Sequence, residues 1–259
     1  MAYFHGTIYS QVLQMNTSVT AVVPNTILTD EKPYPVVYLL HGLSGNFSDW
    51  ESAQLQLLSE TYRICLILPE VQRSFYIDMK YGLPYFTYIS EELPKICKKL
   101  FPISDKREDT YVMGLSMGGY GALKCALKKP EQYAGCAAFS AACDIEEVAK
   151  RAEEEQRIDE MKAILGLDYE LLKENDLFLM AKECEASTLK PSIFMTCGTE
   201  DFIYNMSVKF RDFMKDVDIP FVYQEWSGTH EWYLWNKSLH LACEHFFERV
   251  QLENYCNIQ

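Results

Sequence analysis

The sequence predicts an α/β fold: a mostly parallel central sheet with helices on both faces. Short apolar runs, such as residues 35–40 and 63–68, alternate with stretches in which leucine and alanine recur at helical intervals. The apolar runs are continuous, which is typical of strands that are covered on both faces. We therefore expect strand and helix to alternate along most of the chain, as they do around parallel sheets.

Length and composition are consistent with one domain. A chain of 259 residues with 48% hydrophobic residues can bury a substantial core, so we expect a single domain over residues 1–259. The formal net charge of −13 argues against nucleic acid or a membrane as partner, because anionic surfaces would be repelled. Anionic substrates are disfavoured for the same reason, unless a local basic pocket receives them.

The cysteines and the N-terminus indicate the cellular setting. Nine cysteines are scattered without a Cys-x-x-Cys pair or a zinc-type histidine spacing, so we expect free thiols and neither a metal site nor a disulfide framework. The first residues lack the basic and apolar regions of a signal peptide, and no apolar run reaches transmembrane length. We expect a cytoplasmic protein, and whether it forms a homo-oligomer is left open.

The first half of the chain predicts an edge hairpin and then alternating elements. Residues 7–14 and 17–23 are rich in β-branched residues and alternate in character, which is typical of an antiparallel hairpin turning at Met15 and Asn16. The next expected elements are a central strand at 35–40, a helix within 48–60, a strand at 63–68, an aromatic segment at 74–88 and a helix at 89–100.

The second half continues this alternation with one interruption. We expect strands at 110–113, 133–139, 191–198 and 221–226, and helices at 117–128, 207–217 and 232–250. The interruption, at about 144–188, carries many charges with apolar residues at helical intervals, which predicts amphipathic helices. We expect this helical insertion to form a small cap above the active site.

A Gly-x-Ser-x-Gly motif joins the strand at 110–113 to the helix that follows it. A serine on so sharp a turn needs strained backbone angles, and Gly114 and Gly118 remove the Cβ atoms that would clash. The turn would lift the Ser116 hydroxyl out of the sheet, and the Met117 amide would point toward a developing oxyanion. A purely structural glycine-rich turn is the alternative interpretation.

The loop after the strand at 35–40 is a candidate for the second half of an oxyanion hole. It reads His41-Gly42-Leu43-Ser44-Gly45, and a glycine there allows the backbone to approach a substrate closely. We expect the amide of Leu43 to be the donor and His41 to be structural. An ordinary strand-to-helix loop is the alternative.

A candidate acid and base follow the last two strands. Asp201 comes after the strand at 191–198, and His230 comes after the strand at 221–226. A histidine can take the serine proton, while a carboxylate fixes its tautomer. The chain order of Ser116, Asp201 and His230 is that of the α/β-hydrolase fold. Glu200 and Glu231 are rival carboxylates.

The motifs together resemble the esterase D-like group of α/β-hydrolases, particularly its bacterial tributyrin esterases. The matching segments are Tyr38 to Asn46, Gly114 to Ala122, Gly198 to Phe202 and Gly228 to Trp232. The resemblance implies a catalytic triad of Ser116, Asp201 and His230, oxyanion donors at Leu43 and Met117, and hydrolysis of short-chain carboxylic esters without a cofactor.

The substrate is less closely specified. Trp50, Tyr76 and Tyr85 are expected, with the insertion, to line the substrate pocket, although aromatic clusters are as often plain packing. Related members of the group are acetyl and feruloyl esterases, whose substrates derive from plant polysaccharide, and S-formylglutathione hydrolases. The last usually carry histidines around the nucleophile, where this chain has Leu115 and Tyr120. Acyl transfer to an alcohol would use the same residues.

A binding protein without catalytic activity is the alternative from another functional class. It would require a disrupted site, whereas every expected part is present in this sequence. The sequence therefore predicts a serine carboxylesterase that acts on a small-molecule ester through an acyl-enzyme.

Overall fold

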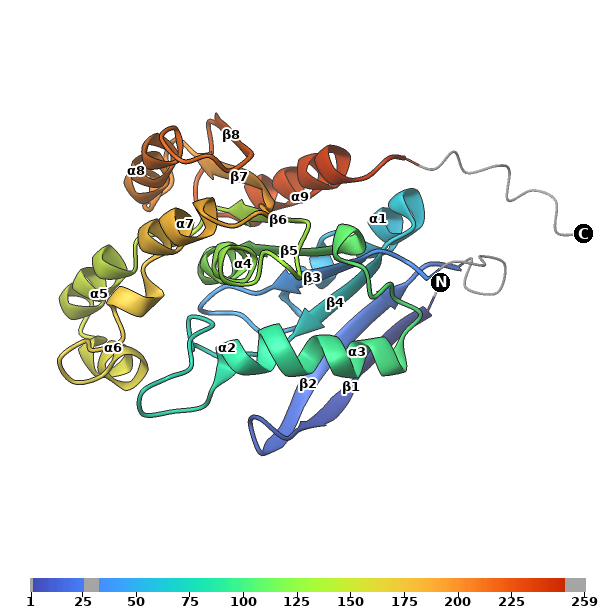
Figure 1. The fold of residues 1–259 in the computed structure, drawn as a ribbon, viewed down its shortest axis with the longest axis horizontal. Coiled ribbons are helices and arrows are strands. Elements are labelled where there is room, and N and C mark those ends of the chain that lie inside the picture. The colour runs from blue at the N-terminus through green and yellow to red at the C-terminus, as the bar shows by residue number, and fades with distance from the viewer. Residues whose placement is uncertain (1, 26–32, 250–259) are drawn as a thin grey trace, which may run out of the picture.

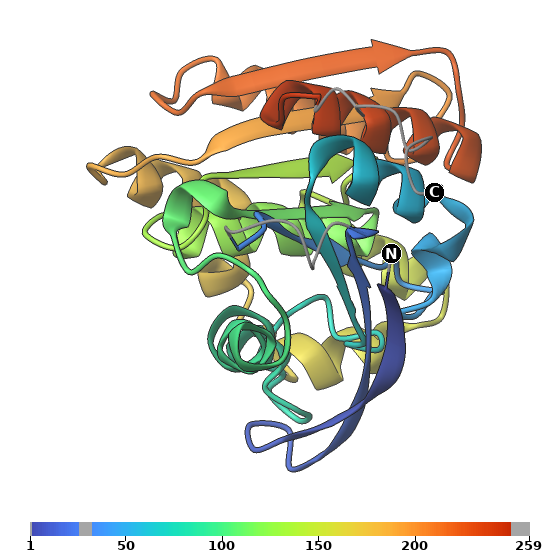
Figure 2. The same ribbon diagram turned by 90° about the vertical axis from the view of Figure 1, so that its right-hand side faces the viewer.

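The computed structural model describes residues 2–25 and 33–249, and one eight-stranded sheet runs through it in the order β1-β2-β4-β3-β5-β6-β7-β8. The strands are β1 (Ala2–Ser10), β2 (Met15–Val23), β3 (Val36–Leu40), β4 (Cys65–Pro69), β5 (Thr110–Leu115), β6 (Gly135–Phe139), β7 (Ser192–Gly198) and β8 (Phe221–Trp226). From β4 to β8 all neighbours are parallel, and only β2 pairs antiparallel, with β1 and β4. The predicted mostly parallel sheet is confirmed, and Figure 2 shows β1–β2 and β8 at its opposite edges.

Each face of the sheet has its own core. In β3, Val36, Tyr38 and Leu40 belong to one core, while Val37 and Leu39 belong to the other. Helices α1 (Leu55–Tyr62) and α9 (Trp232–Phe246) cover one face (Figure 1). The other face is covered by α3 (Leu93–Leu100), α4 (Met117–Lys128), α7 (Leu177–Glu185) and α8 (Tyr204–Met214). Strands buried on both faces explain the continuous apolar runs in the sequence.

The insertion between β6 and β7 contains three α-helices. These are α5 (Ile145–Glu154), α6 (Ile158–Leu165) and α7, with a short 3₁₀ turn (Lys173–Asn175) before α7. Helix α5 begins at Asp144, whose side chain accepts a hydrogen bond from the N–H of Glu147. Helix α7 packs on α4 as part of the core layer, whereas α5 and α6 extend past the sheet (Figure 1).

Several predicted boundaries differ from the structure. The hairpin turns at residues 11–14, because Ser10 pairs with Met15 and Gln14 takes a left-handed φ of 53°. The helix expected at 89–100 begins earlier, with α2 (Tyr85–Thr87) and a π-turn (Tyr88–Glu92) leading into α3. The last helix ends at Phe246, and residues 250–259 lie outside the described part of the chain.

The eight cysteines among the described residues are unpaired and buried. Burial raises the pKa of each thiol, for example that of Cys65 to about 12. Cys256 lies outside the described residues. In the described ranges, no three His, Cys, Asp or Glu side chains gather as metal ligands. None of the helices in these ranges is sufficiently long and apolar to cross a membrane.

Candidate active site

Ser116 occupies a strained turn between β5 and α4. Its backbone angles are φ 54° and ψ −118°, a conformation that L-residues rarely adopt. Hydrogen bonds hold the turn in place, since the N–H of Ser116 donates to the carbonyl oxygen of Phe139 (2.9 Å) and its carbonyl accepts from Ala142 (3.2 Å). The hydroxyl consequently projects from the end of the sheet into a cavity.

The two glycines of the motif have steric reasons to be glycine. A Cβ on Gly114 would lie 2.3 Å from the carbonyl oxygen of Gly118, and a Cβ on Gly118 would lie 2.2 Å from that of Leu40. Both contacts are with backbone atoms, which cannot move aside without displacing α4 or β3. The spacing of the motif therefore reflects the close approach of helix and sheet.

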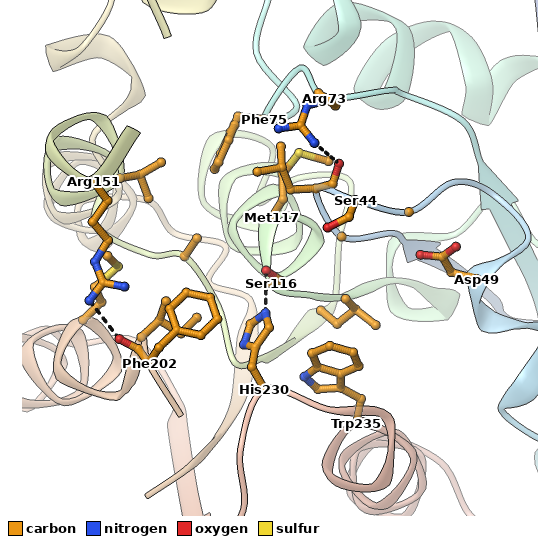
Figure 3. A pocket seen from close by; sticks show the side chains of 18 of the residues that line it. Ser44, Asp49, Arg73, Phe75, Ser116, Met117, Arg151, Phe202, His230 and Trp235 are labelled. Carbon is orange, nitrogen blue, oxygen red and sulfur yellow. Dashed lines mark hydrogen bonds between the residues drawn. The ribbon is translucent and has the colours of Figure 1, made fainter. Parts of the chain in front are cut away.

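His230 and Asp201 come together beside Ser116. His230 Nε2 lies 3.0 Å from Ser116 Oγ, and His230 Nδ1 lies 2.9 Å from Asp201 Oδ2 (Figure 3 shows the first contact). His230 follows β8 and Asp201 follows β7, so the carboxyl ends of parallel strands bring the three groups to one edge. The geometry is that of a nucleophile, a general base and an orienting carboxylate.

The carboxylate of Asp201 is buried and charged. Burial alone would raise the pKa of Asp201, but the hydrogen bond and charge of His230 and the N–H of Ile203 (3.0 Å) lower this pKa below its ordinary value. The rival Glu200 is exposed and accepts from the N–H of Gly228 (2.5 Å). Glu231 is also exposed. Of the three carboxylates, Asp201 is therefore the one placed to orient His230.

Two aromatic rings flank the imidazole of His230. The ring centroid of Phe202 lies 4.5 Å from it, and that of Trp235 lies 4.9 Å from it at an interplanar angle of 89°. Phe202 follows Asp201 directly, and Trp235 lies in the first turn of α9. Figure 3 shows both rings beside the imidazole, where they restrict its rotation.

Leu43 and Met117, the expected oxyanion donors, both line the cavity next to Ser116. Met117 is the first residue of α4, so its N–H has no partner within the helix and lies at the positive end of the helix dipole. The N–H of Leu43 belongs to a tight turn in which Gly45 donates to the carbonyl of Gly42 (3.2 Å). Two backbone donors are thus available beside the serine.

The buried side chain of His41 supports this turn from the protein interior. The N–H of Val71 donates to His41 Nε2 (3.2 Å), so the proton of a neutral ring is on Nδ1, which donates to the carbonyl oxygen of Gly42 (2.8 Å). The carbonyl of Gly42 and the N–H of Leu43 belong to one trans peptide and point in opposite directions. By holding the carbonyl of Gly42, the fully buried His41 orients the N–H of Leu43 away from its own ring.

The predicted substrate residues Trp50, Tyr76 and Tyr85 do not line the cavity. All three are buried: Trp50 Nε1 donates to the carbonyl of Leu40 (3.2 Å), and the Tyr76 hydroxyl donates to that of His41 (3.0 Å). The prediction differs from the structure because these large rings fill the core beneath the site. Aromatic composition indicates packing but not which way a ring faces.

A cavity of about 800 Å³ surrounds the serine. The aromatic segment and the insertion, both expected near the substrate, do contribute to its wall, although none of the residues involved was named individually. Sequence reasoning missed the other wall residues altogether: Arg73, Phe202, Met206, Trp232 and Trp235. Phe75 comes from the aromatic segment, and α5 with the turn after it contributes Val148, Arg151, Glu155 and Arg157. Phe202 and Trp235 were recognisable only by their proximity in sequence to Asp201 and His230.

Known proteins resemble this chain over nearly its whole length. A family model described as putative esterase matches residues 10–246. An acetyl esterase of Caldicellulosiruptor saccharolyticus is 32% identical over 264 residues, which cover 94% of this chain and 97% of that protein.

Two solved structures share the architecture at 25% identity. The fluorophosphonate-binding serine hydrolase F of Staphylococcus aureus, in a substrate-bound structure, has a TM-score of 0.86 and covers 95% of this chain and 98% of its own. An S-formylglutathione hydrolase of Staphylococcus aureus has a TM-score of 0.81 with the same coverage. The predicted α/β-hydrolase fold and esterase D-like resemblance are confirmed. The chain belongs to the putative esterase family and is a carboxylic ester hydrolase.

Proposed function

We propose that this enzyme hydrolyses short-chain carboxylic esters through an acyl-enzyme on Ser116. The observation that carries the proposal is the contact of 3.0 Å between His230 Nε2 and Ser116 Oγ, with Asp201 on the opposite nitrogen. A serine hydroxyl is a weak nucleophile, and a base within hydrogen-bond reach removes its proton as it attacks.

The reaction divides into two steps. In the first, Ser116 attacks the ester carbonyl, His230 takes the serine proton and then gives it to the leaving alcohol, and the acyl group stays on the serine. In the second, His230 removes a proton from water, whose oxygen attacks the acyl carbon. The bond from this carbon to Ser116 Oγ then breaks, the carboxylic acid leaves, and His230 returns the proton to Ser116. Asp201 stabilises the imidazolium in both steps.

The negative charge that forms on the carbonyl oxygen needs donors already in place. The N–H groups of Leu43 and Met117 are proposed to bind it. Backbone donors cost no reorganisation at the moment of reaction, and one such donor is worth about 10²- to 10³-fold in kcat. The proposed mechanism requires only side chains and amides of this chain.

The acetyl esterase relative supports a small acyl group. The cavity of about 800 Å³ is larger than an acetyl group needs and has both aromatic and charged walls, which supports a bulkier alcohol part. A sugar or another polar alcohol is consistent with such walls. Unpaired thiols at the eight described cysteines support a reducing, cytoplasmic site of action.

A fluorophosphonate probe and a panel of esters test the proposal. We expect the probe to label Ser116, and we expect p-nitrophenyl acetate and butyrate to be hydrolysed faster than esters of longer acids. In Ser116→Ala, labelling should vanish and kcat should fall by several powers of ten. Undiminished hydrolysis by Ser116→Ala would refute the proposal. Feruloyl, acetyl-sugar and S-formylglutathione substrates in the same panel would rank the alternatives.

A further inference from the structure

Arg73 joins the turn that carries Leu43 to the helical insertion. It lies in the loop after β4, lines the cavity, and donates from Nη1 to the carbonyl oxygen of Leu43 (3.3 Å), a contact drawn in Figure 3. The same guanidinium donates to Glu160 of α6 through Nε and through Nη2 (3.0 Å to Oε2). One planar group therefore bridges a backbone carbonyl and a carboxylate.

The carboxylate of Glu160 is fixed from a second side. Arg157 Nη1 donates to Glu160 Oε2 (2.7 Å), and Arg157 also pairs with Glu155 (2.5 Å). Partial burial alone would raise the pKa of Glu160, but the hydrogen bonds and charges of Arg73 and Arg157 lower this pKa below its ordinary value. Leu43, Arg73, Glu160, Arg157 and Glu155 thus form a continuous row, which we name the arginine bridge.

We propose that Arg73 is a positioning residue, which holds the oxyanion turn in its active conformation and couples that turn to the insertion through Glu160. The inference rests on the proposed function, because it assumes that Leu43 donates to an oxyanion. Arg73 itself donates to a backbone carbonyl and acts on the reaction only through the turn.

The need for such a tie follows from how the turn is held. His41 Nδ1 and the N–H of Gly45 both donate to the carbonyl oxygen of Gly42 and so hold this peptide in place. The next peptide, between Leu43 and Ser44, follows this anchor, and Arg73 Nη1 donates to its carbonyl oxygen. Isolated exposed ion pairs contribute little, but this one is bidentate and part of a network. If the turn rotates even slightly, the N–H of Leu43 no longer points at the oxyanion, and the reaction rate falls.

Arg73→Ala should therefore lower kcat for p-nitrophenyl acetate by about tenfold, which is part of the 10²- to 10³-fold that one whole oxyanion donor contributes. KM for this small ester should change less than twofold, because the donor acts mainly in the transition state. The rate of fluorophosphonate labelling should fall in parallel. The pH profile of kcat should keep its midpoint, because His230 and Asp201 are untouched.

A second variant tests the coupling to the insertion. Glu160→Gln keeps the shape of the side chain but weakens its grip on Arg73, so we expect a smaller loss of kcat, of about threefold. The double variant should lose no more than Arg73→Ala alone, because both changes break one row of contacts. Losses that multiply would overturn the coupling.

Lys128→Ala provides the matched control. Lys128 of α4 pairs with Glu183 of α7 (3.0 Å), so it also ties the insertion to the core, but it does not line the cavity. This variant should keep the wild-type kcat. If Arg73→Ala fails to fold, Glu160→Gln and the wild type at about 1 M salt take its place, since salt screens the exposed bridge and should lower kcat.

The outcomes separate the two proposals. A wild-type kcat in Arg73→Ala, with Ser116 still labelled, would overturn the role of Arg73 and leave the esterase function intact. An equal loss in Lys128→Ala would also overturn it, because any weakening of the insertion would then suffice. A wild-type protein that hydrolyses no ester and binds no probe would refute the proposed function itself.

Discussion

Lys124 Nζ donates a hydrogen bond of 2.6 Å to Asn175 Oδ1, although 51 positions separate the two residues. Lys124 lies in α4, and Asn175 ends the 3₁₀ turn before α7 in the insertion. The same ammonium group donates to the carbonyl of Tyr76 (3.0 Å), and the hydroxyl of Tyr120, one turn earlier, donates to the carbonyl of Asn175 (2.7 Å). The helix that follows Ser116 is thereby fastened to the insertion by buried polar groups.

Burial makes this fastening sensitive to pH. Desolvation lowers the pKa of Lys124 to about 7, whereas an unfolded lysine titrates near 10.4. Between these values the unfolded chain holds a proton that the folded chain has lost, so the free energy of unfolding rises with pH. Relative to Lys124→Met, we expect the wild type to gain stability from pH 7 to 8.5, approaching about 1.4 kcal/mol per unit. Urea unfolding at several pH values measures the difference, and a flat difference would contradict the prediction.

Gly118→Ala should destabilise the protein by about 3 kcal/mol or more, because the added methyl group would overlap the carbonyl of Leu40. Gly6→Ala is the matched control, since no atom lies within 4 Å of a Cβ there. Thermal unfolding of both variants checks the prediction. Equal shifts in Tm would show that the close approach of α4 to β3 does not matter.

Asp201→Asn should lower kcat by about 10³- to 10⁴-fold, because an amide no longer fixes the tautomer of His230. Glu200→Gln, on the adjacent residue, should stay within about threefold of the wild type. Esterase kinetics at neutral pH distinguish the two carboxylates. A larger loss in the Glu200 variant would reverse their roles.

The lowered pKa of Asp201 also predicts a change in stability with pH. A carboxylate whose pKa is lower in the folded state stabilises the fold above its unfolded pKa, near 3.9, and this contribution is lost as pH falls through the folded pKa. Asp201→Asn should thus be less stable than the wild type at pH 7, with a gap that closes below about pH 4. Denaturant unfolding in acid checks the sign.

His41→Ala should reduce kcat by about 10- to 100-fold, because the carbonyl of Gly42 loses its imidazole donor and the N–H of Leu43 loses its fixed direction. The deletion leaves a cavity of the size of an imidazole ring. Free imidazole added to this variant should restore part of the rate, and it should leave the wild type unchanged. A variant that folds and keeps full activity would show that the turn containing Leu43 does not need the side chain of His41.

The meeting of Ser116, Asp201 and His230 was predictable because each residue is marked by the local sequence around it. Ser116 stands out in sequence because steric contacts demand glycine on both sides, and Asp201 and His230 each follow a recognisable apolar strand. Parallel strands carry their loops to one edge, so positions far apart in the chain could be predicted to meet. The sheet itself was predictable because strands buried on both faces leave continuous apolar runs in the sequence.

The individual side chains of the pocket wall were not predictable in this way, although two of the segments that supply them were expected there. Tyr76 sits in an irregular loop without a period, so the sequence does not indicate that its hydroxyl turns inward to the carbonyl of His41. Arg73 and Glu160 lie 87 positions apart, and neither belongs to a motif. Contacts of this kind depend on how the insertion folds back over the loops, which is decided by tertiary packing.

The buried thiols can be used to measure local unfolding of the protein. A thiol with a raised pKa is almost wholly protonated at neutral pH and is shielded from reagents, so alkylation needs a transient exposure. Cys143 follows Ala142, whose N–H donates to the carbonyl of Ser116, while Cys197 lies in β7 and Cys243 in α9. The order in which these thiols are modified would therefore rank how often each region opens locally. Mass spectrometry after brief alkylation would then map local stability without any engineered label.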